Sequence, residues 1–206
     1  MPVDRPNNFV VNRFSAFFEL QLGRLGKKPN KEFTLRLILN SFEISGSGWK
    51  ISNERTLRTA AFRRDDPINH RTLEMGSTTV QRKFRNKGLG RGFFLQISPL
   101  SNSEDAASRV EDFEQRLLER LANILSSEKY GESLSIDLPR ANRVKGVKYK
   151  VVINGKERND LAIAFNVENV FSVIVCSFFE ESWNIHDAIQ LASEQAIKIW
   201  DNLEIA

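Results

Sequence analysis

The sequence has few of the residues on which catalysis and metal binding usually depend. Its 206 residues include one cysteine, Cys176, and two histidines, His70 and His186. A single cysteine excludes a disulfide within the chain and favours a reducing compartment, and its apolar surroundings predict a small buried side chain rather than a reactive thiol. Neither histidine stands at metal-ligand spacing from Cys, Asp or Glu. We therefore expect no metal and no cofactor.

A motif for nucleotide binding is also missing. The run Gly88-Leu89-Gly90-Arg91-Gly92 superficially resembles a phosphate-binding loop, but such a loop follows a strand and opens a helix with Gly-Lys-Ser/Thr. Here the glycines precede an expected strand, so a hairpin turn is the simpler interpretation. Glu180-Glu181, before the last expected helix, could hold a cation, although acids at this position usually interact with the helix dipole. An enzyme of unknown type is an alternative that no residue supports directly.

Long apolar runs are absent, and none approaches the roughly 20 residues needed to cross a bilayer. Residues 1–8 lack the basic start and apolar stretch of a signal peptide, and their polar, proline-bearing sequence predicts a loose tail. With 41% hydrophobic and 27% charged residues, the rest has the composition of an ordinary globular protein. We predict a soluble, cytoplasmic protein.

Two units of a strand followed by a helix organise the chain. In the first, the apolar run Phe93–Ile97 predicts a strand that Pro99 should end, and apolar residues spaced by three or four predict a helix of about five turns over 104–125. In the second, Val170–Cys176 is a strand rich in β-branched residues, and a helix over 185–203 follows. Each helix carries an apolar stripe that should pack on a sheet or on another helix.

The two units are similar enough to raise the possibility of a duplication. If Phe94 is placed on Phe171, Ile97 falls on Ile174, an offset of 77 residues. Two independent α+β halves would produce the same order of elements without common ancestry, so both explanations stay open.

Alternating sequences predict further strands. Thr78–Arg85 alternates and should pair, across Asn86-Lys87-Gly88, with the strand at Phe93. A meander is expected over 134–138, 147–153 and 156–165, with Asn154-Gly155 as a favourable type I′ hairpin turn.

The N-terminal third is harder to assign. Phe9–Leu25 fits neither the helical nor the strand period, whereas Phe33, Leu35, Leu37 and Leu39 alternate as in a strand until Ile38 breaks the pattern. Antiparallel strands that feed one long helix in each half predict an α+β protein, with antiparallel sheet packed against long helices. We expect a flexible tail at 1–8 and two α+β halves, 9–126 and 133–206, joined by a short linker and packed as one compact unit.

The segment Gly46–Thr59 carries the pattern Gly-x-Gly-Trp followed by Glu-Arg-Thr-x-Arg-Thr, and it resembles hypothetical proteins of actinobacteria. The order of elements in each half is similar to that of Mog1/PsbP-like domains, in which an antiparallel sheet packs against helices. This resemblance implies an α+β fold, possibly as two repeats, and a binding, assembly or sensor module more often than an enzyme. It transfers no catalytic motif to this sequence. The extracellular sensors of the group carry disulfides, which a chain with one cysteine cannot form internally.

Positive charge is concentrated in one region. The formal net charge is +4, but Lys50–Arg91 holds eleven Lys and Arg against four acids, so this region carries +7 and the remainder −3. A basic patch of this kind attracts acidic proteins or nucleic acid. The residues that we expect to contact a partner are Arg82, Lys83, Arg85, Lys87, Arg91, Arg55 and Arg58.

Two classes of function fit this basic hairpin. The first is a non-catalytic protein-interaction or assembly module, self-associating or part of a complex, that docks a partner through the sheet and the hairpin. The alternative is binding of RNA, DNA or another polyanion, since the hairpin combines cations that neutralise phosphates with aromatics that stack on bases. Two observations count against nucleic acid: Phe93 and Phe94 are expected to be core residues, and a net charge of +4 is small for a dedicated nucleic-acid binder. We therefore place protein interaction first.

Overall fold

The structure is a computed structural model. It describes residues 31–58, 61–62, 73–74, 78–100, 102–125, 131–153, 156–178 and 184–204. The predicted tail at 1–8, the segment 9–25 and the Asn154-Gly155 turn lie outside the described residues.

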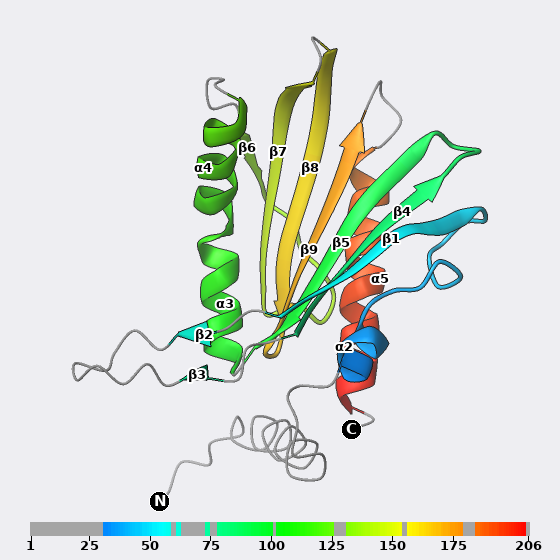
Figure 1. Cartoon of the computed structure of the whole chain (residues 1–206). Helices are drawn as coiled ribbons and strands as arrows, with labels where there is room; N and C mark the ends of the chain where they lie inside the picture. The colour runs from blue at the N-terminus through cyan, green and yellow to red at the C-terminus, as the bar shows by residue number, and fades with distance from the viewer. Residues whose placement is uncertain are drawn as a thin grey trace, which may run out of the picture.

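One seven-stranded antiparallel sheet forms the centre of the described fold (Figure 1). In spatial order its strands are β1 (Trp49–Arg58), β4 (Thr78–Asn86), β5 (Arg91–Pro99), β9 (Val170–Phe178), β8 (Lys156–Val167), β7 (Arg143–Ile153) and β6 (Gly131–Leu134). A separate two-stranded ladder joins β2 (Ala61–Phe62) to β3 (Leu73–Glu74). The predicted hairpin is confirmed as the β4–β5 pair, and Pro99 is the last residue of β5.

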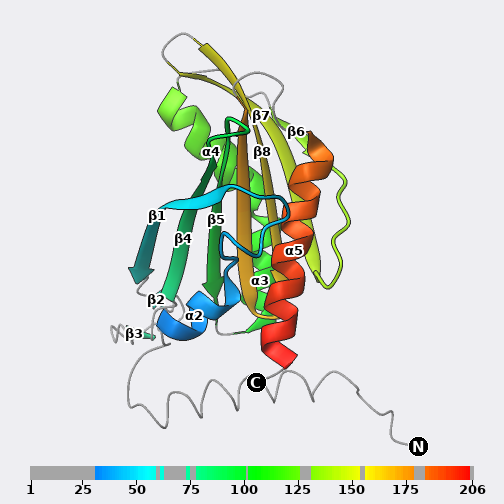
Figure 2. The ribbon, with the colours of Figure 1, turned by 90° about the vertical axis from the view of Figure 1, so that its right-hand side faces the viewer.

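Helices cover both faces of the sheet (Figures 1 and 2). The helices α3 (Ser103–Glu111) and α4 (Phe113–Leu125) lie on one face, over β7, β8 and β9, while α5 (Ile185–Glu204) and α2 (Lys31–Leu37) lie on the other. The long helix predicted over 104–125 is therefore two helices that meet at Asp112. No helix in the described ranges is long and apolar enough to span a membrane.

The main core lies between the sheet and α5. Because side chains alternate along a strand, Phe93, Leu95 and Ile97 of β5 point toward α5, and Phe94 and Gln96 point toward α3 and α4. The α5 face buries large side chains from the central strands and from α5 itself: Phe84, Leu95, Ile97, Ile163, Phe165, Ile174 and Ile199. Smaller apolar clusters lie under α3 and α4 on the opposite face. We call the two faces of the sheet the α5 face and the α3–α4 face.

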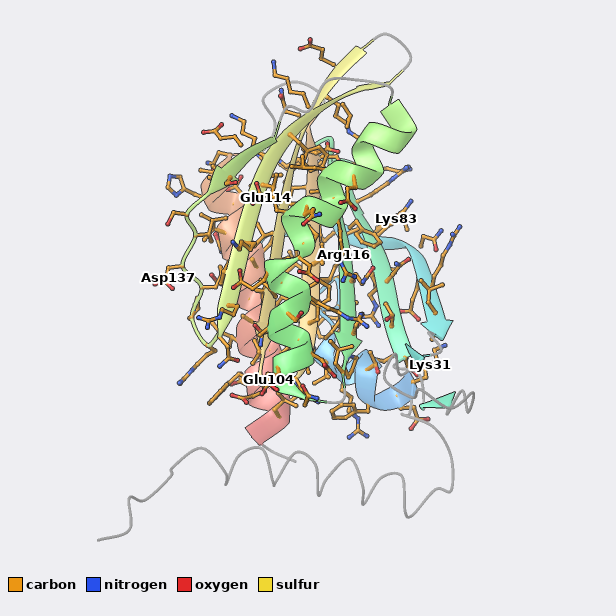
Figure 3. All side chains as sticks on the ribbon, turned by 90° about the vertical axis from the view of Figure 1, so that its left-hand side faces the viewer. Lys31, Lys83, Glu104, Glu114, Arg116 and Asp137 are labelled. Atoms are coloured by element: carbon orange, nitrogen blue, oxygen red, sulfur yellow. The ribbon has the colours of Figure 1, made fainter. Side chains whose placement is uncertain are left out.

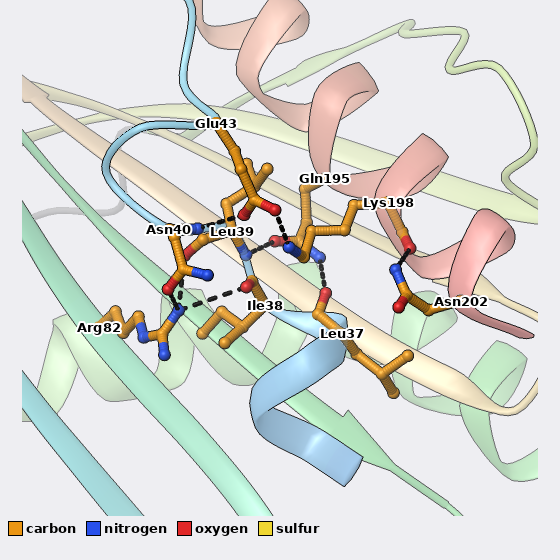
Figure 4. A network of polar contacts seen from close by, with 9 residues as sticks. All are labelled: Leu37, Ile38, Leu39, Asn40, Glu43, Arg82, Gln195, Lys198 and Asn202. Atoms are coloured by element: carbon orange, nitrogen blue, oxygen red, sulfur yellow. Dashed lines mark hydrogen bonds and ion pairs between the residues drawn. The ribbon is translucent and has the colours of Figure 1, made fainter. Parts of the chain in front are cut away.

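The alternation of residues 33–39 predicted a strand there, and this prediction is wrong. Lys31–Leu37 is the helix α2, because Thr34 and Leu37, three residues apart, fall on one helical side and are both buried. The chain then becomes irregular, and Gln195 of α5 binds its backbone: the Leu39 N–H donates to Gln195 Oε1 at 3.0 Å, and Gln195 Nε2 donates to the Leu37 carbonyl at 2.6 Å (Figure 4). A single buried amide therefore ties this segment to α5.

Strand β6 also differs from its prediction. It occupies Gly131–Leu134 rather than 134–138, so part of the expected linker is strand. The next residues leave the ladder because Ile136 packs over Gly146 of β7, where an added Cβ would lie 2.4 Å from Ile136 Cδ1. A side chain at 146 would exclude Ile136 from this place.

The two halves of the chain share one sheet, through the antiparallel pairing of β5 with β9. A two-fold axis that relates antiparallel neighbours within a sheet runs perpendicular to it, so repeated units would carry their helices on the same face. Here α3 and α4 lie on one face and α5 on the other, and both sets pack against β8 and β9. The fold is α+β, and it gives no support to a duplication.

Candidate functional site

A groove runs along the α3–α4 face. The helices α3 and α4 contact β7, β8 and β9, and Lys83 of β4 stays exposed on the same face (Figure 3). Its cross-strand neighbour Asn53 and Arg55, both on β1, are exposed as well. A cavity of about 840 Å³ lies over the sheet on this face. Residues of six strands and the β4–β5 turn line it, among them Asn53, Arg55, Gln81, Lys83, Arg85, Lys87, Phe94, Tyr149, Arg158, Asp160, Val175 and Ser177. A cavity of this size is typical of binding pockets.

The strands give this groove its positive charge. Lys83 and Arg85 alternate on β4 and both are exposed, and their cross-strand neighbours on β1 are Asn53 and Lys50. Neither cation forms an ion pair with another residue in the part of the chain that the structure describes. On α4, by contrast, Arg116 pairs with Asp112 at 2.9 Å. Lys83 and Arg85 therefore give the floor of the groove positive charge that no described acid offsets.

Arg82 does not belong to this surface. It lies between Gln81 and Lys83, so its side chain points to the α5 face, where it is only 5% exposed. Its Nε donates to Glu54 at 2.8 Å. Its Nη1 donates to the Leu39 carbonyl at 2.7 Å and to Asn40 Oδ1 at 2.8 Å (Figure 4). Arg82 fastens the segment after α2 to the sheet.

The other predicted contact residues are distributed around the groove. Arg55, Lys83, Arg85 and Lys87 line it together. Arg91 reaches its rim but pairs with Asp187 of α5 at 2.8 Å. The backbone of residue 58 ends β1, and its side chain lies outside the described part of the structure.

Sequence reasoning missed a second polar group in the groove, centred on Asp160. This residue is 1% exposed, and Arg158 donates to its carboxylate from Nε at 2.7 Å and from Nη2 at 2.6 Å. Tyr149 and Ser177, its direct neighbours on β7 and β9, also hydrogen-bond to it. Arg158 and Asp160 are two residues apart and hence on one side of a strand. That spacing, just before the apolar run at 161–165, was the signal in the sequence from which this polar group could have been predicted.

Burial dominates the electrostatics of this group. It raises the pKa of the Asp160 carboxyl, and the hydrogen bonds from Arg158, Ser177 and Tyr149 oppose that shift. Burial, together with the charge of Asp160, also raises the pKa of the Tyr149 hydroxyl far above its ordinary value. Tyr149 is therefore neutral at physiological pH and acts as a hydrogen-bond donor, and the group as a whole holds Arg158 in a fixed orientation.

The remaining reactive residue types lie away from the groove. Cys176 is fully buried on the α5 face, and burial raises the pKa of its thiol. His186 is exposed in the first turn of α5, and His70 lies outside the described residues. Within the described ranges, no group of three or more His, Cys, Asp or Glu residues is placed to hold a metal.

No protein-family model and no curated protein matches this sequence.

Proposed function

We propose that this protein is a non-catalytic interaction module, and that the groove docks an acidic segment of a protein partner. The observation that carries the proposal is the pair Lys83 and Arg85, exposed on the groove floor with no ion pair to a described residue. Lys50 and Arg55 add charge from β1. Positive charges gathered on a concave surface attract and orient an anionic partner.

The uncharged part of the floor favours a polypeptide as the occupant. Asn53 and Gln81 offer amides for a partner's backbone, and Phe94 and Val175 offer an apolar surface. Gln81 Nε2 donates to Gln96 Oε1 at 2.8 Å, which holds both amides in place. Mixed polar and apolar linings of this kind fix orientation and add affinity.

The sequence resemblance points to the same class of function. Mog1/PsbP-like domains are more often binding and assembly modules than enzymes, and we keep membership of that group as a proposal. We also propose a cytoplasmic location, since a single buried cysteine suits a reducing compartment. Self-association is one form that the protein interaction could take.

Nucleic acid is the second candidate, and Phe94 is the observation in its favour. This ring lies in the groove directly opposite Lys83 on the neighbouring strand, and aromatic rings beside cations bind single strands. Phe93 cannot contribute, because it is 4% exposed and stacks on Phe84 at 4.6 Å. One half-buried ring is a small stacking platform, so we rank this function below protein docking.

Fluorescence anisotropy tests the two candidates side by side. The probes are a labelled pool of 12-residue acidic peptides with one variable apolar position, a single-stranded RNA and a duplex DNA, titrated between 50 and 200 mM salt. The test variant is Lys83→Glu/Arg85→Glu. The control is Lys31→Glu/Arg36→Glu, which makes the same charge change at two exposed residues of α2 on the other face of the sheet.

We expect the peptides to bind the native protein and the control alike, and the test variant at least tenfold more weakly. Five phosphate contacts to a single strand would cost RNA roughly 100-fold in affinity over this salt range. If RNA shows that loss and binds more tightly than the peptides, the nucleic-acid function replaces the protein one. Equal binding by the test and control variants would remove the groove from either function.

A further inference from the structure

One end of the groove is built differently from the rest of its floor. Four residues on adjacent strands form a row across it: Arg85, Gly92, Ser177 and Asp160. Gly92 leaves the middle of this row without a side chain, and an added Cβ would lie 3.0 Å from the Phe84 carbonyl oxygen and 3.7 Å from Arg85 Cγ. The row is therefore a shallow hollow, with Arg85 on one side and the Asp160 group on the other.

Arg158 is held rigidly at this hollow. Its two hydrogen bonds to Asp160 fix the plane of the guanidinium, and 23% of the side chain stays exposed toward the groove. Asp160 is itself buried and further bonded to Ser177 and Tyr149, so Arg158 cannot swing away without breaking the network. An arginine that is already oriented loses little conformational entropy when it binds an anion.

The net charge around the hollow is positive. Arg85 and Lys87 line this end of the groove from β4 and the turn after it, and Arg158 stands opposite on β8. Asp160 is the acid among them, and Arg158 neutralises it. Two arginines and a lysine around one hollow are donors of the kind that recognise phosphate. The guanidinium of Arg85 can bind two phosphate oxygens at once, whereas Nε and Nη2 of Arg158 already bind Asp160.

We propose that this end of the groove binds a phosphate monoester, and that the docked partner segment carries a phosphorylated serine, threonine or tyrosine. This inference rests on the proposed function of the groove. A monoester carries about −1.5 to −2 charges and three acceptor oxygens, which match donors on both sides of the hollow. A carboxylate brings one charge and two oxygens, against the larger charge and three oxygens of the monoester.

The subsite can be tested without knowing the partner. Phenyl phosphate, titrated into the ¹⁵N-labelled protein, should shift the amide resonances of Gly92 and Ser177 in a saturable manner, and benzoate should shift them at least fivefold less at equal concentration. Arg85→Ala should abolish the response and Lys83→Ala should retain it. Equal responses to phenyl phosphate and benzoate would overturn the phosphate assignment and leave the acidic docking surface standing.

The phosphorylated partner is tested with acidic peptides that differ only at one central residue. We expect phosphoserine to bind at least tenfold more tightly than serine, and glutamate to bind within threefold of serine. Arg85→Ala, an exposed change, and Arg158→Lys, which keeps the charge but loses the planar fork, should each reduce the tenfold preference to threefold or less. Lys83→Ala should weaken all three peptides and leave the preference intact.

The possible failures are distinguishable. If all three peptides bind equally, the phosphate inference is overturned and the proposed docking function stands. If none binds, both fail. If a 5′-phosphorylated RNA binds more tightly than the phosphopeptide, with the same loss in Arg85→Ala, the phosphate source is nucleic acid and the protein partner is overturned. Thermal melts of each variant confirm that the fold is intact.

Discussion

The two faces of strand β4 use the same kind of residue in opposite ways. On the α5 face, Arg82 is buried and satisfied by Glu54, two backbone carbonyls and Asn40. On the α3–α4 face, Lys83 and Arg85 are exposed and pair with no other described residue. A cation with all its partners inside the molecule maintains the fold, and a cation without them is available to a ligand. Substitutions on the two faces should therefore have opposite consequences for stability and for binding.

The largest effect is expected from Arg82→Ala. This change leaves the Glu54 carboxylate and the carbonyl groups of the segment after α2 without their donor, and removing one partner of a buried ion pair typically costs about 4 kcal/mol. Urea denaturation followed by circular dichroism measures the loss. A loss below about 1 kcal/mol would mean that Arg82 is solvated rather than structural.

A slightly smaller effect is expected where α5 holds the same segment. Gln195→Leu removes the hydrogen bonds to the backbone of Leu37 and Leu39, and two unsatisfied buried groups cost about 3 kcal/mol together. Gln190→Leu is the matched control, because this exposed amide of α5 bonds only Glu194 at 3.2 Å among the contacts of the described chain. If the two variants lose equal stability in the same denaturation assay, the clamp is unimportant.

The third effect is a loss of stability at high pH that comes from Tyr149, a member of the Asp160 group. The pKa of Tyr149 is raised in the folded protein, so the stability associated with it is complete below the unfolded pKa of about 10 and falls as pH rises above it. The loss should be about 1.4 kcal/mol for each pH unit above 10. Tyr149→Phe should remove this slope, as measured by urea unfolding at pH 9, 10 and 11. Parallel curves for the two proteins would show that the hydroxyl ionises freely.

The smallest effect on stability is expected on the open floor. Lys83→Glu and Arg85→Glu should each change the free energy of unfolding by less than about 0.5 kcal/mol, as exposed substitutions usually do, although they should weaken peptide binding at least tenfold. Thermal melts of each variant, next to the α2 control variant, provide the measurement. A loss of stability comparable with that of Arg82→Ala would place these residues in the fold rather than in a binding surface.

Much of the fold could be predicted because local patterns and tertiary packing agree. Thr78–Asn86 alternates, the next strand ends at Pro99, and Asn184 caps α5 through a 2.9 Å bond from the Asp187 amide. The alternation of residues 33–39 wrongly predicted a strand where α2 lies, because a short apolar segment satisfies the strand and the helix period equally well. There, burial of Thr34 and Leu37 decided the outcome.

The site was predictable only in part. A concentration of charge is visible in the sequence, and it led to Arg55, Lys83, Arg85 and Lys87, which do line one groove. Alternation within β4 could have separated Arg82 from Lys83, but it does not say which face is covered. Arg158 lies in another half of the chain, and only the antiparallel order β4, β5, β9, β8 brings it to the same face.

The sequence by itself determined the α+β class, most strand positions and the concentration of positive charge, because these depend on periodicity, turn residues and composition over short distances. The tertiary structure alone decided the strand order, the face that each helix covers, and hence which cations are buried and which remain open. Those outcomes depend on packing between residues far apart in the chain. Arg82 is the example: the segment after α2, which encloses it, lies more than 40 residues earlier in the sequence.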